Sequence, residues 1–410
     1  MKSTRPVPPI WLMGLSNTTL GLSSGINFFL MPQLMAAAHV SVPKIAAITA
    51  VAAAASFWYV FFAPILDVRF SRRWYATTLA LLSGAAATTA VISLNHLLIL
   101  QIAMVISCVA AQLSSSALGG WLSTVTPNEQ KNLLSKWMNI AFFFGMGLIA
   151  ATGAEFVRRL PVIPAATLVG VIVFLPATIF LFIPAPGPDR RLASESFLQF
   201  NREVISLFRR REVVIVLLLF LSPCSTFALT NLLGGLGADF HTSARAVSLS
   251  GGVGTFIPGL LGCSLFPVIA RRLRLRTFYF ANGIVGCLLT LSLVFLPHTK
   301  FTFALVLFGE FLFQAVSYAI QLGIVFEAIG PDNPLAATIF AFLGAATNVP
   351  MTYLTFIDGR AYAAAGIKGM LFIDAGIGIL ACTVAAVLFA KFVSTAAARE
   401  NSIALPQQEG

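Results

Sequence analysis

Long apolar segments separated by short polar breaks recur along the whole chain of 410 residues. A helix needs about 20 predominantly apolar residues to cross the hydrocarbon core of a bilayer. The predicted spans are residues 10–36, 45–66, 75–94, 97–119, 137–157, 164–184, 213–235, 247–269, 277–296, 301–326, 335–357 and 370–391. We therefore expect an all-α membrane protein with twelve transmembrane helices.

The basic residues are concentrated in alternate polar breaks. Most of the 26 Lys and Arg lie at the N-terminus, near residues 67, 130, 190–212 and 271, and at the C-terminus. Loops rich in Lys and Arg remain on the cytoplasmic side of a membrane, and an even number of spans puts both termini on the same side. The pattern predicts a multi-pass protein of the cytoplasmic (inner) membrane with cytoplasmic N- and C-termini.

The longest polar stretch, from Pro184 to Glu212, divides the chain into two six-helix halves. Its apolar residues recur at helical spacing opposite arginines, which is typical of an amphipathic helix in the membrane interface or of a simple tether. The predicted parts are an N-terminal bundle (1–184), a cytoplasmic linker with this amphipathic helix (185–212), a C-terminal bundle (213–395) and a cytoplasmic tail (396–410).

The two halves resemble each other weakly. Pro64 at the end of the second span corresponds to Pro267 at the end of the eighth, and Pro127 after the fourth corresponds to Pro331 after the tenth. These offsets along the chain are nearly equal, which indicates a duplication. Secondary transporters are built from such repeats, with the solute path between them.

Composition excludes several classes of protein. Hydrophobic residues make up 58% and charged residues 10% of the chain, whereas roughly 25% of a soluble chain is charged. The net charge of +11 is mostly explained by membrane topology, and no basic segment has the interleaved aromatic residues of a nucleic-acid binder. The five cysteines lie in apolar stretches without metal-ligand spacing, and no catalytic fingerprint occurs in a suitable context. We expect no enzyme activity, catalytic residue, metal or cofactor, and no nucleic-acid partner.

One polar stripe crosses an otherwise apolar span. Glu310, Gln314, Ser317 and Gln321 share one face of the tenth span, with Tyr318 beside them. Burial favours the neutral form of a carboxyl group, so Glu310 is a candidate proton carrier. Asp374 near the start of the twelfth span is the second candidate. The alternative is a glutamate that only ties its helix to a neighbour.

Polar residues also recur at near-helical spacing in the first, fourth and seventh spans, and the eleventh span contributes Asn348. Each Ser or Thr could instead bond its own helix or a neighbouring one. No Lys or Arg lies in the middle of a span, which argues against a strongly anionic solute. The expected cavity residues are Asn17, Ser24, Asn27, Gln112, Ser115, Thr226, Thr230, Gln314, Ser317, Tyr318, Gln321 and Asn348.

The break after the second span carries a family resemblance. The run D-V-R-F-S-R-R (67–73) resembles the G-x-x-x-D-R-x-G-R-R/K signature of the major facilitator superfamily. The runs F-W-Y-V-F-F-A-P-I-L-D (57–67) and S-R-R-W (71–74) resemble the AmpG-type muropeptide permeases, which share a branch with peptide and acetyl-CoA transporters and some siderophore importers. The resemblance implies two six-helix bundles around a cavity lined by helices one, four, seven and ten.

The same resemblance implies a conformational latch. An anion at the end of the second span can sit against the positive N-terminal end of another helix, which in the superfamily is the start of helix eleven, here Asn333-Pro334-Leu335. We expect Asp67 and Arg69 to hold the halves together on the cytoplasmic side. Arg72 and Arg73 either belong to this latch or are ordinary positive-inside anchors.

The sequence thus predicts a monomeric secondary transporter that binds a small-molecule solute and protons in the lipid bilayer. It would move a bulky polar or amphiphilic solute, muropeptide-like, peptide-like or siderophore-like, by alternating access and proton-coupled import. A drug or metabolite efflux pump of the same fold and a transport-inactive membrane receptor remain open alternatives.

Overall fold

The computed structural model describes residues 8–68, 70–185, 202, 205–207, 209–232, 236–237, 239–242, 244–330 and 333–404. Within these residues every regular element is a helix. Arg69 and most of the predicted linker with its amphipathic helix lie outside the described residues.

The first half of the chain forms six helical rods. The first rod is interrupted, because it consists of several short helices in succession. The elements are α1 (Ile10–Leu15), α2 (Thr18–Gly25), η1 (Ile26–Leu30), α3 (Met31–Ala37), α4 (Val42–Trp58), η2 (Tyr59–Asp67), α5 (Arg72–Ile92), α6 (Leu97–Val125), η3 (Asn128–Gln130), α7 (Lys131–Arg159), α8 (Val162–Phe174) and η4 (Leu175–Leu181).

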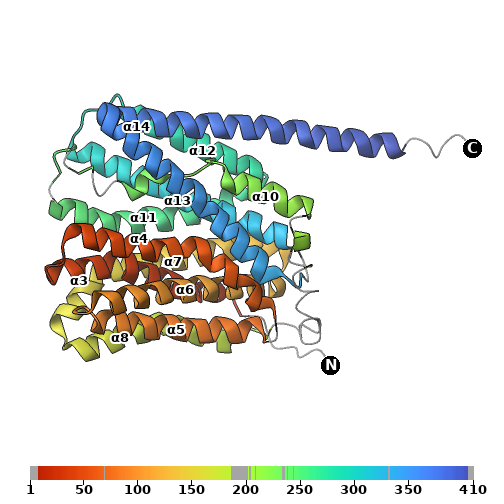
Figure 1. The fold of residues 1–410 in the computed structure, drawn as a ribbon. Coiled ribbons are helices and arrows are strands. Elements are labelled where there is room, and N and C mark those ends of the chain that lie inside the picture. Colours follow the sequence, from red (N-terminus) through yellow and green to blue (C-terminus); the bar gives the residue numbers. More distant parts are fainter. Residues whose placement is uncertain are drawn as a thin grey trace, which may run out of the picture.

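The second half contains α10 (Arg211–Leu221), η5 (Ala228–Asn231), α11 (Ala244–Ala270), α12 (Leu275–Leu293), α13 (Lys300–Ile329) and α14 (Ala336–Ala404). Helix α14 is bent sharply at Ala365 and Gly366, where Gly366 has a φ of 63°. A positive φ is easily adopted by glycine because it has no Cβ. The bend makes two arms, residues 336–364 and 367–404, and the second arm turns back along the bundle (Figure 1).

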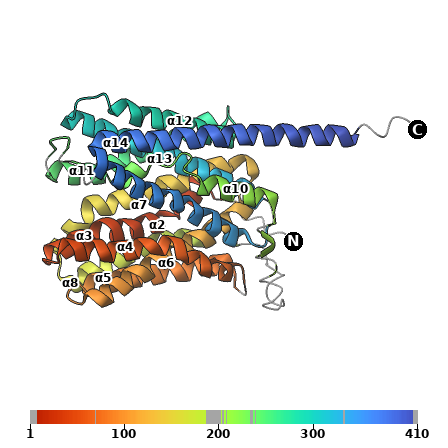
Figure 2. The ribbon, with the colours of Figure 1, turned by 45° about the horizontal axis from the view of Figure 1, so that its top comes forward.

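The helices of the two halves lie in two groups, one above the other in Figure 1 and again in the turned view of Figure 2. Glycines allow close packing within a group, as is usual for membrane helices. A Cβ on Gly21 of α2 would lie 2.1 Å from the carbonyl oxygen of Phe142 in α7. Large side chains such as Phe61 (79% exposed) and Phe295 (82%) face outward, as expected for a surface covered by lipid.

Within the described residues, eight helices are long and apolar enough to cross a membrane, counting α14 with both its arms as one. The all-α fold is confirmed, and each predicted span coincides at least in part with helical residues. The count of twelve spans is consistent with this arrangement and stays a prediction.

The seventh predicted span departs most from expectation. A continuous helix over residues 213–235 was expected, but α10 ends at Leu221 and an extended stretch follows it. Pro223 disfavours a helical conformation for Ser222 and cannot donate a backbone hydrogen bond. Two residues later, Ser225 has a φ of 52°, so the chain turns within the bundle before the short helix η5.

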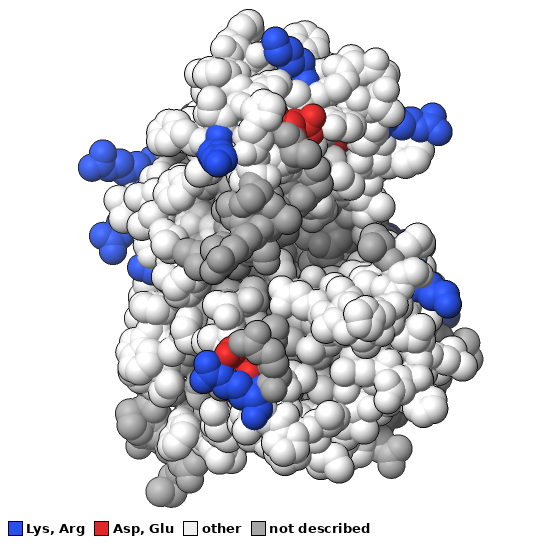
Figure 3. All heavy atoms as spheres, turned by 90° about the vertical axis from the view of Figure 1, so that its left-hand side faces the viewer, with Lys and Arg blue, Asp and Glu red and all other residues white. Residues whose placement is uncertain are grey.

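The face opposite the termini is shown in Figure 3. Its basic side chains are spread over the surface rather than gathered into one patch. No single basic patch therefore marks a binding surface on this face.

Candidate functional site

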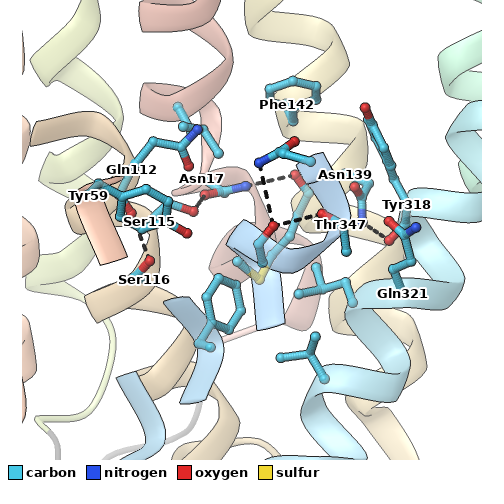
Figure 4. Close-up of a pocket in the computed structure, with 17 residues that line it drawn as sticks. Asn17, Tyr59, Gln112, Ser115, Ser116, Asn139, Phe142, Tyr318, Gln321 and Thr347 are labelled. Carbon is cyan, nitrogen blue, oxygen red and sulfur yellow. Dashed lines mark hydrogen bonds between the residues drawn. The ribbon is translucent and has the colours of Figure 1, made fainter. Parts of the chain in front are cut away.

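A cavity of about 190 Å³ lies between the two groups of helices. Its walls come from both halves of the chain, and the residues labelled in Figure 4 converge on it from several helices. The lining residues are Asn17, Leu20, Tyr59, Gln112, Ser115, Ser116, Met138, Asn139, Phe142, Tyr318, Gln321, Leu322, Val325, Phe340, Gly344, Thr347 and Asn348. All of these side chains are uncharged, and five of them are amides.

Asn17 organises one wall of the cavity. It lies in the turn between α1 and α2 and accepts a hydrogen bond from the Ser115 hydroxyl at 2.8 Å. Its amide donates to the Met138 carbonyl at 3.2 Å. Because Ser115 is in α6 and Met138 is in α7, the interrupted first rod is joined to two neighbours at the level of the cavity (Figure 4).

Four other amides keep an acceptor available. Gln112 donates to the Ser56 hydroxyl at 3.4 Å, Asn139 to the Ser135 carbonyl at 3.0 Å, Gln321 to the Tyr279 hydroxyl at 3.2 Å and Asn348 to the Gly344 carbonyl at 3.5 Å. These contacts use the amide nitrogens. No described residue donates a hydrogen bond to any of the four side-chain oxygens, so a solute with hydroxyl or N–H groups would find acceptors here.

Aromatic rings supply the apolar part of the lining. The rings of Phe142 and Tyr318 meet edge to face with centroids 6.4 Å apart, and Tyr318 stacks on Phe143 at 6.1 Å. Phe340 lies against Gly119, where an added Cβ would be 2.2 Å from its ring. The cavity therefore combines flat apolar surfaces with uncharged hydrogen-bonding groups.

Half of the twelve expected cavity residues line this cavity: Asn17, Gln112, Ser115, Tyr318, Gln321 and Asn348. Sequence reasoning missed four polar lining residues, namely Tyr59, Ser116, Asn139 and Thr347. Ser116 and Thr347 adjoin the expected residues Ser115 and Asn348, whereas Tyr59 and Asn139 lie in the second and fifth spans, from which no cavity residue was expected.

Ser24 and Asn27 are not part of the lining. Asn27 is 1% exposed and donates to the carbonyl of Ser23 at 2.8 Å. Ser23 in turn contacts the hydroxyl of Ser107 at 3.1 Å. These bonds hold Asn27 and Ser23 inside the first bundle, although Oδ1 of Asn27 has no partner among the described residues, and Ser24 is half-buried.

Two residues of the stripe on α13, Gln314 and Ser317, face the interrupted seventh span, whereas Gln321 and Tyr318 line the cavity. Ser317 donates to the Ser225 carbonyl at 2.6 Å, and Gln314 donates to the Thr230 hydroxyl at 2.9 Å. From α12, Asn282 donates to the Ser225 hydroxyl at 2.9 Å. The backbone and side-chain groups left free by the break thereby find partners.

Thr226 and Thr230 share this internal role. The hydroxyl of Thr226 donates to the Cys224 carbonyl at 3.5 Å and that of Thr230 to the Phe227 carbonyl at 2.7 Å. Both bonds are local to the broken segment, and neither threonine lines the cavity.

Glu310 is 1% exposed and lies deep between α12 and α13. Its Oε1 accepts a hydrogen bond from Thr290 at 2.5 Å, whereas its Oε2 has no partner among the described residues. Asp374 in the second arm of α14 is 5% exposed, and its Oδ1 likewise has no hydrogen-bond partner among the described residues. Neither acid lines the cavity, so a proton on either would act on the solute indirectly.

Asp67 joins the two halves at the end that carries the termini. Its carboxylate is buried at the start of α14, where Oδ2 accepts from the Thr338 backbone N–H at 2.8 Å and from the Thr338 hydroxyl at 2.7 Å. Its Oδ1 accepts from the Ala337 N–H at 3.3 Å and from Arg72 at 2.7 Å. An anion at this position is stabilised by the positive end of the helix.

Arg72, 2% exposed, completes the contact. Besides Asp67, its guanidinium donates to the Asn333 carbonyl at 3.2 Å and to the Pro334 carbonyl at 2.7 Å. Arg73 is half-buried and forms no ion pair with a described residue. Of the four expected latch residues, Asp67 and Arg72 therefore meet the other half, and Arg69 lies outside the described residues.

The comparison with family models decides the affiliation. The model described as the Major Facilitator Superfamily matches residues 13–349. The chain belongs to the Major Facilitator Superfamily. Members of this superfamily are transporters, not enzymes, and this protein is accordingly a multi-pass membrane transporter.

Solved structures agree on the fold of this superfamily member. The fucose:proton symporter of E. coli is 14% identical with a TM-score of 0.71, over 92% of this chain and 98% of that one. The human organic anion transporter MFSD10 (TETRAN) is 17% identical with a TM-score of 0.68, over 92% and 100%. A bacterial homologue of the iron transporter ferroportin, in an outward-facing state with soaked iron, is 15% identical with a TM-score of 0.65, over 94% and 98%.

At these identities the solved structures establish the fold alone. A search of curated proteins finds no match. The resemblance to the muropeptide permease branch stays a prediction.

Proposed function

We propose that this transporter moves a compact, uncharged, polar solute by alternating access of the cavity between its two bundles. The observation that carries the proposal is the cavity lining, in which five amides and several hydroxyls stand beside aromatic rings without any charged side chain. Such a lining matches a solute rich in hydroxyl or amide groups. An ionic solute would leave its charge unpaired there, which is costly away from water.

The size of the cavity narrows the solute class. Pockets for drug-sized ligands occupy about 300–1,000 Å³, whereas this cavity has a volume of about 190 Å³. The volume favours a solute smaller than the muropeptide-like or siderophore-like molecules predicted from the sequence, which would fit only after the bundles separate.

We further propose that transport is coupled to protons and directed inward, with Glu310 and Asp374 as the proton-carrying groups. Burial of both carboxyls and the unpartnered oxygens on each support this role. The E. coli protein of similar fold is a fucose:proton symporter, which shows that this architecture can serve proton symport.

Asp67 and Arg72 act in this proposal as the latch of one conformational state. Their bonds to the first turn of α14 join the bundles at the terminus-bearing end. In this proposal the N- and C-termini lie on the cytoplasmic side of the inner membrane. The described conformation is then closed on the cytoplasmic side, and these bonds must break before solute is released into the cell.

The test is solute counterflow in proteoliposomes that contain the purified protein. A panel would compare monosaccharides and polyols with nucleosides, small neutral peptides, muropeptides, ferric siderophores and acyl-CoA esters. We expect exchange of a neutral compact solute, together with proton uptake when a proton gradient is imposed. Exchange of an anionic acyl-CoA alone would refute the proposed solute class, and binding without counterflow would identify a receptor. Net outward movement against a proton gradient would identify an efflux pump.

A further inference from the structure

A second buried acid faces Asp374 across the bend of α14. Asp358 lies in the first arm and Asp374 in the second, at similar distances along the chain from Ala365 and Gly366. Because the arms fold back on each other, the two carboxyl groups lie close enough to interact with each other. Asp358 stood one residue beyond the predicted eleventh span, so the sequence offered no reason to select it.

The pair is isolated from water and from other donors. Asp358 is 0% and Asp374 5% exposed. Both oxygens of Asp358 and Oδ1 of Asp374 have no hydrogen-bond partner among the described residues. Two ionised carboxylates in contact inside a bundle would repel each other strongly, whereas a single proton between them converts the repulsion into a hydrogen bond.

Among the described residues, the groups around the pair add negative charge, and none of them is a neutralising cation. Glu310 of α13 interacts electrostatically with both aspartates, and the Cys287 thiol of α12 lies near Asp374. The nearby cations on α14 point elsewhere, since Arg360 is exposed with its guanidinium 4.7 Å from the Phe356 ring centre and Lys368 is exposed.

Tyr362, a further polar residue of the first arm, is engaged elsewhere. The hydroxyl of Tyr362 donates to Asp239 at 2.8 Å on an exposed part of the surface. Among the described residues, no group of three His, Cys, Asp or Glu side chains is placed to hold a metal ion. A proton is therefore the ligand that suits this pair.

We propose that Asp358 and Asp374 share one proton and form the proton-binding site of this transporter, at a place separate from the solute cavity. The inference rests on the proposed proton-coupled transport and adds Asp358 to it. Glu310 is the neighbouring carboxyl that exchanges a proton with the pair. One hydrogen bond joins the first arm of α14 to the interrupted seventh span near this pair, because Asn231 of η5 donates to the Thr355 hydroxyl at 3.4 Å, one turn before Asp358.

Infrared difference spectroscopy of the protein in nanodiscs, between acidic and alkaline buffer in H₂O and D₂O, tests the pair directly. We expect the wild type to give a protonated-carboxyl C=O band that titrates and shifts in D₂O. Asp358→Asn and Asp374→Asn should each shift or remove this band, because the protonated carboxyl loses the carboxylate with which it shares its proton. Glu129→Gln, at an exposed acid, should leave the band as in the wild type.

The outcomes separate the inference from the proposed function. A band that persists unchanged in either folded Asn variant would overturn the shared proton, as would the absence of such a band in the wild type. Asparagine is isosteric and can donate a hydrogen bond to the remaining carboxyl, and one folded variant suffices since both report on the same proton. Net solute uptake without proton movement, with the band intact, would instead refute the proposed coupling.

Discussion

The contact of Asp67 with α14 allows a quantitative prediction for Asp67→Asn. The carboxylate presents two acceptor oxygens, one toward Thr338 and one toward Arg72 and Ala337. An asparagine has one oxygen and one NH₂ group, so one of these two sets of donors would face another donor. The substitution also leaves the guanidinium of Arg72 buried without its counter-charge.

The cost of this change falls mostly on the described conformation. A hydrogen bond to a charged group contributes about 1.5–3 kcal/mol, and removal of one partner from a buried ion pair costs about 3–5 kcal/mol. These contributions overlap, and carbonyl groups of Asn333 and Pro334 still bind Arg72. We therefore expect about 3 kcal/mol, which changes the ratio of the two conformational states roughly 100-fold.

Distances between spin labels across the terminus-bearing end would measure this shift. Suitable sites are Trp74 in the first half and Leu273 in the second, which are 48% and 41% exposed, and the five native cysteines are buried. In the wild type we expect a narrow distribution of short distances, and in Asp67→Asn a dominant population at longer distances with slower counterflow.

A double-variant cycle with Arg72→Gln provides the control. Because the double variant Asp67→Asn/Arg72→Gln no longer buries an unpaired charge, its shift should be smaller than the sum of the two single shifts. Additive shifts, or a distance distribution in Asp67→Asn that matches the wild type, would refute the latch.

Three further variants test other parts of the molecule. Glu310→Gln should abolish proton-driven accumulation and preserve solute exchange, and accumulation at the wild-type level would exclude Glu310 from coupling. Gly120→Ala should favour separation of the bundles, because its Cβ would lie 2.5 Å from the Ala337 nitrogen, and overpacking costs about 1–3 kcal/mol. The spin-label distances should lengthen in Gly120→Ala but not in Gly376→Ala, where nothing lies within 4 Å of the added Cβ. Gln112→Leu should raise the solute concentration needed for half-maximal exchange by about tenfold, which corresponds to the loss of one hydrogen bond. An unchanged value would remove Gln112 from the solute site.

The spans were predictable because hydropathy over about 20 residues reports directly on a bilayer of fixed thickness, and the superfamily was predictable because residues 67–73 resemble its signature. The orientation of polar residues was harder to predict. Gln314 and Ser317 share a helical face with Gln321, as expected, but periodicity does not say which neighbour that face meets. Here it meets the broken segment around Ser225, whose backbone groups needed partners.

Some features of the structure were indicated by single residues, but the general pattern of hydropathy and charge pointed to a different interpretation. The Ser222-Pro223 pair lies in a strongly apolar run, and the run indicated a continuous helix although proline favours an interruption. Arg72 was assigned no certain role in the latch because consecutive arginines at a loop usually serve as anchors. Its burial depends on the approach of α14, a contact between residues far apart in the chain.

The interrupted seventh span bears on how the protein is made. Helix α10 has 11 residues, so at about 1.5 Å per residue it covers roughly half of a ~30 Å hydrocarbon core. Beyond it, the hydroxyl and the carbonyl of Ser225 gain their partners from Asn282 and Ser317, which leave the ribosome later than Ser225. The helices of the second half therefore cannot insert and pack one after another in the order in which they are synthesised. Its seventh segment must wait at the translocon or in a lipid-shielded intermediate until the ninth and tenth arrive, and a chain truncated before Asn282 would be a natural target for membrane quality control.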